Sequence, residues 1–361
     1  MAAAAAQVHP RRPRQVRQDR HLRGARRRHV LSPAVDKHGA AIAVAAIVLL
    51  VVVAGLVRLV DGGASTEPAR ADSRPSPAAG VPTSVPPARP PATAPPRPTH
   101  AANGHVFGAG RFLVAYYGTG GTGSLGVLGE TDPETMHRRL ARAARPFRDL
   151  ARRQGGQVQL VYELIVTVAD PVPGPGRDYS HDIPRRVVQQ YVAAARRHGA
   201  LLLLDLQPGR DRFIDVARRW TWALRQPHVG LALDPEWRMG RRQVPGRVIG
   251  SMSAGEVNLV SGWLDELRRR NGLPEKLLVL HQFRAAMVRD VGQVVRRPGL
   301  AMVQHVDGFG TPGQKLDTYR AVERSRQFHM GFKLFYDEDV RRMSARDVRR
   351  IRPAVRFVSF Q

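Results

Sequence analysis

The chain has 361 residues, no cysteine and a formal net charge of +27, a length that allows one large domain with additional segments. The lack of cysteine excludes disulfide bonds, thiol catalysis and anchoring through a lipid-modified cysteine. The excess of basic residues favours an anionic polymer or surface as partner.

The first 103 residues divide into three segments of different composition. Residues 1–37 hold nine Arg, one Lys and two Asp without apolar periodicity, which predicts a disordered basic tail. Residues 38–60 include nineteen consecutive uncharged residues, Gly39 to Val57, a length that nearly crosses a bilayer as a helix. Residues 61–103 carry 11 of the 28 prolines and predict a semi-rigid extended linker.

The apolar stretch predicts an uncleaved signal anchor. A cleaved signal peptide is the alternative, but its apolar region normally spans only ~7–15 residues. Because basic flanks stay on the cytoplasmic side, we expect a cytoplasmic amino terminus and a single pass through the cell membrane. Residues 104–361 would then be extracytoplasmic. Their 42 Lys and Arg against 25 Asp and Glu also favour an anionic cell-wall polymer or polysaccharide as partner.

Residues 104–361 alternate short apolar runs with longer amphipathic stretches. Eight runs begin at Phe112, Val158, Ala200, Val229, Lys276, Leu300, His329 and Val355. This alternation predicts a TIM-type (β/α)8 barrel, without a closing helix after the last strand. The runner-up is a doubly wound open sheet, for which Gly118, Gly120 and Gly123 supply a G-x-G-x-x-G pattern. No acidic residue follows at the end of a second strand, so we interpret these glycines as a loop over the barrel mouth.

Two of the amphipathic stretches have clear helix signals. Residues 132–156 open with Asp132 and Pro133 and close on Gly156, which predicts one long helix. Residues 253–272 open with Ser253 and Glu256, the spacing of a capping box, and close on Gly272.

Polar side chains gather where the predicted strands end, which is the working face of such barrels. They include Tyr116, Tyr117, Glu163, Asp205, Gln207, Asp234, Glu236, His281, Gln282, His305, Asp307, Lys333, Tyr336, Ser359 and Gln361.

The fourth strand ends in two acids, Asp234 and Glu236. Val229, Leu231 and Leu233 share one parity and would face helices, so Asp234 and Glu236 would face the barrel axis. Two close carboxylates raise each other's proton affinity, so one can act as a general acid. We assign Glu236 as the proton donor and leave Asp234, Glu163 and Asp205 as candidates for the second catalytic role. The alternative is that Asp234 only opens an Asp-Pro turn and Glu236 pairs with Arg238.

The stretch GLALDPEW, residues 230–237, resembles the end of strand four in chitinase-like family 18 glycoside hydrolases and family 25 lysozymes. LVAYYG, from Leu113, resembles the first strand of the chitinase-like group. The resemblance implies that Glu236 is the catalytic acid. The chain departs from the first family at Gly230 and Ala232, where that motif has further Asp residues, and from the second in having no Asp on strand one. Substrate-assisted and direct mechanisms therefore both stay open.

These observations predict a glycoside hydrolase that acts on cell-wall or surface polysaccharide without a metal or other cofactor. Expected substrate contacts come from aromatic and polar side chains at the strand ends: Tyr116, Gln207, Trp237, His281, Gln282, His305, Asp307 and Tyr336.

Two other functions stay open. A metal-dependent hydrolase would gather His281, His305, Asp205, Asp307 and Glu163 around a divalent ion. A non-catalytic barrel would bind a wall polymer through its basic face. No nucleic-acid-binding motif is present.

Overall fold

The computed structural model describes residues 104–361. The predicted basic tail, membrane helix and Pro-rich linker lie outside the described residues. Within residues 104–361, none of the helices combines the length and the apolar character that crossing a bilayer would need.

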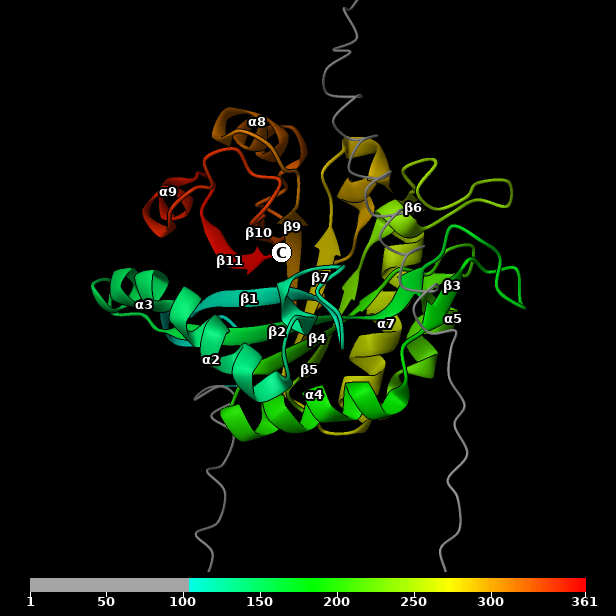
Figure 1. Cartoon of the computed structure of the whole chain (residues 1–361), viewed down its shortest axis with the longest axis horizontal. Helices are drawn as coiled ribbons and strands as arrows, with labels where there is room; N and C mark the ends of the chain where they lie inside the picture. Colours follow the sequence, from blue (N-terminus) through cyan, green and yellow to red (C-terminus); the bar gives the residue numbers. More distant parts are fainter. Residues whose placement is uncertain (1–103) are drawn as a thin grey trace, which may run out of the picture. The chain divides into compact units, whose positions relative to one another are not determined.

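Eight parallel strands close into a barrel (Figure 1). Each strand pairs with the next in the order β1, β2, β4, β5, β7, β9, β10, β11, and β11 pairs back onto β1. The strands are β1 (Phe112–Thr119), β2 (Val158–Ala169), β4 (Leu201–Leu206), β5 (Val229–Leu233), β7 (Lys276–His281), β9 (Leu300–Val306), β10 (His329–Leu334) and β11 (Val355–Phe360). The predicted barrel is confirmed, and the doubly wound open sheet is excluded.

The helices lie outside the barrel wall (Figure 1). They are α2 (Pro133–Ala143), α3 (Arg145–Arg152), α4 (Arg185–His198), α5 (Phe213–Arg219), α6 (Thr221–Leu224), α7 (Ala254–Arg270), α8 (Pro312–Val322) and α9 (Ala345–Arg350). Short 3-10 turns are η1 (Gly108–Gly110), η2 (Val127–Gly129), η3 (Pro235–Trp237), η4 (Ala285–Met287) and η5 (Val291–Gln293). β3 (Ser180–Asp182) pairs antiparallel with β2.

The structure differs from the sequence prediction in two of the crossovers. The predicted helix over 132–156 is two helices, because Pro146 lacks the N–H that a continuous helix needs and its ring crowds the preceding turn. The connection from β7 to β9 has no α-helix. There Asp290 adopts a left-handed conformation with φ of 54°, which stops any regular helix, and β8 (Val288–Arg289) instead pairs with β6 (Met252–Ser253).

Apolar side chains form two cores, one on each side of the barrel wall. The outer core packs strand residues such as Leu231 and Leu233 against the helices. The inner core fills the barrel with Leu113, Ala115, Val161, Leu203, Ala232, Leu277, Val279, Ala301, Val303 and Phe357, and adds Val106 and Phe107. The parity predicted for β5 is confirmed, because Ala232 faces inward while its neighbours face the helices.

The glycine-rich turn after β1 folds closely back on the strand. A Cβ at Gly129 would lie 1.8 Å from the carbonyl oxygen of Thr119, and one at Gly126 would lie 2.4 Å from that of Tyr117. Gly126 also has a φ of 128°, which side-chain-bearing residues rarely adopt. Close backbone approach therefore explains glycine at these two positions, and Gly126 sits beside the side chain of Gln361.

Candidate functional site

A buried set of polar side chains continues the inward-facing rows of the inner core toward the carboxyl ends of the strands. We define the mouth cluster as Tyr117, Glu163, Asp205, Asp234, Glu236, His281, His305, Asp307 and Lys333. Strand pairing sets Tyr117 beside Glu163 and His281 beside His305. All members are buried except Glu236, which is partly exposed. The barrel therefore changes from an apolar plug to a polar, charged layer at its mouth.

His281 lies between two carboxylates. Its Nδ1 donates a hydrogen bond of 3.1 Å to Asp307, and its Nε2 lies 3.2 Å from an oxygen of Glu163. Burial and the charge of Lys333 lower the pKa of His281, but the contacts with Asp307 and Glu163 outweigh them and raise it well above its usual value. His281 is therefore an imidazolium at neutral pH.

Lys333 supplies the second positive charge of the mouth cluster. Its Nζ lies 3.7 Å from Asp307, donates a 3.2 Å hydrogen bond to Gln361, and sits 3.6 Å from the centre of the Tyr117 ring. Burial raises the pKa of Asp307, but the hydrogen bond from His281 and the charge of Lys333 hold it below its usual value. Asp307 is therefore ionised and fixed between two cations.

The Tyr117 hydroxyl orients Asp205 through a hydrogen bond. The Tyr117 hydroxyl donates a 2.9 Å hydrogen bond to one Asp205 oxygen, while the other oxygen lies 3.9 Å from His281 Nε2. Gln207 donates to the same hydroxyl at 3.5 Å. Burial raises the pKa of Asp205 to about 6, and the positive His281 limits that rise. Asp205 thus carries its negative charge at neutral pH.

Asp234 and Glu236 follow β5 directly, and both carboxyl groups have raised pKa values. Burial, and then the negative charge of Glu236, raise the pKa of Asp234 well above its usual value. Burial, and then the charge of Asp307, raise the pKa of Glu236 to about 8, although Lys333 and His281 pull it down. The mouth therefore holds a partly exposed, protonated Glu236 near an ionised Asp205.

The predicted alternative pairing of Glu236 with Arg238 is wrong. Arg238 Nε instead lies 3.0 Å from Glu256, and Glu256 also accepts a hydrogen bond from the Phe213 backbone. Ser253 caps α7 as predicted, but this use of Glu256 leaves the capping box without its second half. The Glu236 side chain has no ion pair or hydrogen bond within residues 104–361, whereas its backbone carbonyl accepts from the Gly250 N–H. Asp234 does precede the η3 turn, but its side chain does not cap it.

His305 behaves oppositely to His281. Burial, and then the charges of His281 and Lys333, lower the pKa of His305 well below its usual value. Its ring centre lies 5.1 Å from that of His281, and its Nε2 lies 3.2 Å from the Ser359 hydroxyl. His305 is therefore neutral, which makes it a natural reference for the charged His281.

Unpaired polar atoms concentrate at this mouth. Ten buried side-chain nitrogen or oxygen atoms in the described part of the chain lack a hydrogen-bond partner. Eight of them belong to Glu163, Asp205, Asp234, Trp237, His281, His305 and Asp307, and two of these eight, Glu163 Oε1 and His281 Nε2, face each other as an ion pair at 3.2 Å. Since buried polar groups are nearly always paired in native proteins, such a concentration indicates a surface adapted to a polar ligand.

Several predicted substrate-binding residues lie apart from the mouth cluster. Tyr116 faces the outer core, where its ring lies 6.2 Å from Phe360 and its hydroxyl 3.5 Å from that of Tyr336. The Gln282 amide donates to the Arg284 carbonyl and accepts from Gln304, also on the outer side.

Trp237, by contrast, is buried directly after Glu236, and its indole nitrogen has no hydrogen-bond partner. The sequence analysis gave no role to Tyr117 or Lys333. Extending the parity of Leu113 and Ala115 along β1 by one step would have selected Tyr117 rather than Tyr116.

The mouth cluster fits a metal ion poorly. Within residues 104–361, no group of three or more His, Asp or Glu side chains has a geometry that could hold one. The metal-hydrolase alternative therefore has no support from these residues.

Comparison with known proteins assigns no family to the chain. No protein-family model matches it, and no curated protein matches it either. The likeness of residues 230–237 to glycoside hydrolases therefore depends on those residues alone.

Proposed function

We propose that this protein is a membrane-anchored, extracytoplasmic glycoside-hydrolase-like barrel that cleaves cell-wall or surface polysaccharide, with Glu236 as general acid. One observation carries the proposal. Glu236 is partly exposed at the barrel mouth, has no ion-pair partner within the described residues, and has its pKa raised to about 8. A carboxylic acid that keeps its proton at neutral pH is what protonation of a leaving glycosidic oxygen requires.

Asp205 is the best candidate for the second carboxylate. It is ionised above pH about 6, and the Tyr117 hydrogen bond fixes its orientation. Its other oxygen lies 3.9 Å from the His281 nitrogen and has no hydrogen-bond partner within residues 104–361. Glu163 is less available, because His281 lies against it, and burial raises the pKa of Asp234 well above its usual value.

The positive residues have a supporting role in this mechanism. His281 and Lys333 stabilise the ionised forms of Asp205 and Asp307, so that negative charge persists beside the protonated Glu236. The oxocarbenium-like transition state of glycoside cleavage gains stability from such nearby negative charge.

The first experiment measures reducing ends released from cell-wall polysaccharide by the full chain, by Glu236→Gln and by a matched variant, Asp337→Asn. Asp337 is an exposed carboxylate just after β10, outside the mouth cluster. We expect release by the parent and by Asp337→Asn, and loss of at least ~100-fold in Glu236→Gln. Equal release by Glu236→Gln would contradict the assignment of the acid.

A non-catalytic wall-binding barrel is the second candidate, favoured by the basic excess of residues 104–361. It predicts no reducing ends from any wall fraction and equal polymer binding by the parent and by Glu236→Gln. The same two variants therefore separate the two functions.

A further inference from the structure

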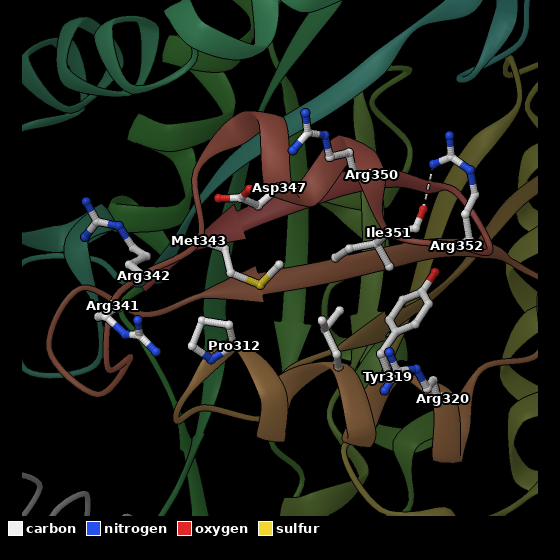
Figure 2. Close-up of a pocket in the computed structure, with 11 residues that line it drawn as sticks. Pro312, Tyr319, Arg320, Arg341, Arg342, Met343, Asp347, Arg350, Ile351 and Arg352 are labelled. Carbon is white, nitrogen blue, oxygen red and sulfur yellow. Dashed lines mark hydrogen bonds between the residues drawn. The ribbon is translucent and has the colours of Figure 1, made fainter.

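A basic groove lies on the outer wall of the barrel between α8 and α9. Its cavity volume is about 800 Å³. Figure 2 shows Arg341 and Arg342 at one end of this groove and Arg320 and Arg352 at the other, with Arg350 along one side. Asp347 is the only acid that lines it. The groove is therefore strongly cationic, with charge at both ends.

Most of this positive charge is not neutralised by the described residues. The side chains of Arg341 and Arg350 make no hydrogen bond or ion pair within residues 104–361. Arg320 pairs with Asp317, but both side chains are well exposed, and such pairs are worth little. These arginines are therefore available to an anionic ligand.

The single acid in the groove, Asp347, can offset at most one of the five arginine charges that line it. Its hydrogen bonds with Ser344 lower its pKa, and the charge of Arg350 lowers it further. The Asp347 side chain accepts hydrogen bonds from the backbone N–H and hydroxyl of Ser344 and thereby completes the capping box of α9. Its geometry is thus fixed by the helix end rather than by the facing arginines.

The floor of the groove is apolar and smooth. Met343 and Ile351 are buried there, and Leu316 is partly buried. Tyr319 is fully buried, its hydroxyl donates to the Pro353 carbonyl, and its ring packs against Phe332. The floor therefore offers an apolar contact surface but no exposed aromatic ring on which a nucleobase could stack.

Contacts between protein groups link Arg342, at one end of the groove, to Lys333 of the mouth cluster. The Arg342 guanidinium lies 4.2 Å from the centre of the Tyr336 ring. The Tyr336 backbone N–H donates to the Gln361 carbonyl, and the Gln361 side chain accepts from Lys333 of the mouth cluster.

We propose that the α8–α9 groove binds a linear polymer in which phosphodiesters alternate with polyol or sugar units. The arginine forks at the two ends engage separate phosphates, since Arg matches phosphate oxygens in a bidentate manner. The aliphatic part of the intervening unit lies on the apolar floor. The choice of a wall-type polymer rests on the proposed function, whereas the groove itself needs no catalysis to bind.

The test is binding of poly(glycerol phosphate) of defined length to the full chain at fixed ionic strength. The groove variant replaces Arg320, Arg341, Arg342 and Arg350 with Gln and spares Arg352, which donates to backbone carbonyls. The matched control replaces four exposed arginines on α4, on α5 and just after α6, away from α8 and α9: Arg186, Arg196, Arg218 and Arg225. Both variants lose the same net charge and keep the basic amino-terminal segment. Melting temperatures check that both remain folded.

We expect the groove variant to lose at least about tenfold in affinity, with a shallower salt dependence, and the control to lose no more than about twofold. Equal losses in the two variants, or no loss in either, would overturn the proposal. Two further probes have the same number of charges: a single-stranded thymidine oligonucleotide and polygalacturonate. Groove-dependent binding of either as tight as that of poly(glycerol phosphate) would refute the assigned polymer class. Binding without any release of reducing ends would leave this inference intact and contradict only the proposed catalysis.

Discussion

Replacing His281 by Asn tests the electrostatic account of the mouth most directly. The substitution removes one positive charge that lies 3.9 Å from Asp205. At an effective dielectric constant of about 20, a unit charge at that distance is worth ~4 kcal/mol, or ~3 pKa units. Relaxation of the site will reduce this, so we expect the pKa of Asp205 to rise by at least ~1 unit from about 6.

The same substitution also acts on the proposed acid. His281 lowers the pKa of Glu236, so its removal raises that pKa above about 8. Activity requires ionised Asp205, which fails as the pH falls, and protonated Glu236, which fails as the pH rises. The parent profile should therefore be bell-shaped between pH about 6 and pH about 8, and both limbs should move to higher pH in His281→Asn.

The control for this experiment is His305→Asn. His305 is buried beside His281 but neutral, so its loss removes volume and hydrogen bonding without removing charge. The pH dependence of reducing-end release is measured for all three proteins, and ¹³C NMR of labelled Asp carboxyl groups follows Asp205 where activity is low. An unmoved Asp205 titration in His281→Asn, or an equal movement in His305→Asn, would refute the reasoning.

Two further substitutions test the hydrogen bond that orients Asp205 and the close packing of the turn after β1. Tyr117→Phe removes the hydrogen bond that favours ionised Asp205, so only the acidic limb of the pH profile should move upward, by up to ~1 unit, while the alkaline limb stays; movement of both limbs would contradict this assignment. Gly129→Ala places a Cβ 1.8 Å from the Thr119 backbone oxygen and should cost at least ~2 kcal/mol of unfolding free energy in urea titrations. Gly292→Ala, with no atom within 4 Å, should change it by less than ~0.5 kcal/mol; similar losses in both would show that close approach is not the cause.

The fold could be predicted because its signals are local. Each of the eight strands is a short apolar run followed by a turn residue or a helix cap, and parity along β5 was enough to orient Ala232 inward. The missing helix between β7 and β9 could not be foreseen in the same way. It depends on Asp290 accepting a left-handed conformation, which the type of residue permits but does not require.

The site was only partly predictable, because its chemistry depends on distances across the barrel. Sequence spacing could place Glu163, Asp205 and Asp234 at the mouth but could not rank them. The structure separates them: His281 lies against Glu163, the Tyr117 hydroxyl donates to Asp205, and burial followed by the charge of Glu236 raises the pKa of Asp234. Neither His281 nor Tyr117 is close in sequence to the carboxylate that it contacts.

The charge balance of the mouth cluster explains why β5, a buried strand, can be followed by the two carboxyl groups of Asp234 and Glu236. Five carboxyl groups, those of Glu163, Asp205, Asp234, Glu236 and Asp307, face only two cations, His281 and Lys333. In a largely buried site, a carboxyl group whose negative charge no cation balances is more stable in its protonated form. The mouth must therefore hold at least one carboxylic acid at neutral pH. Partial exposure then selects Glu236, because a proton donor has to reach its substrate, whereas Asp234 is buried behind it.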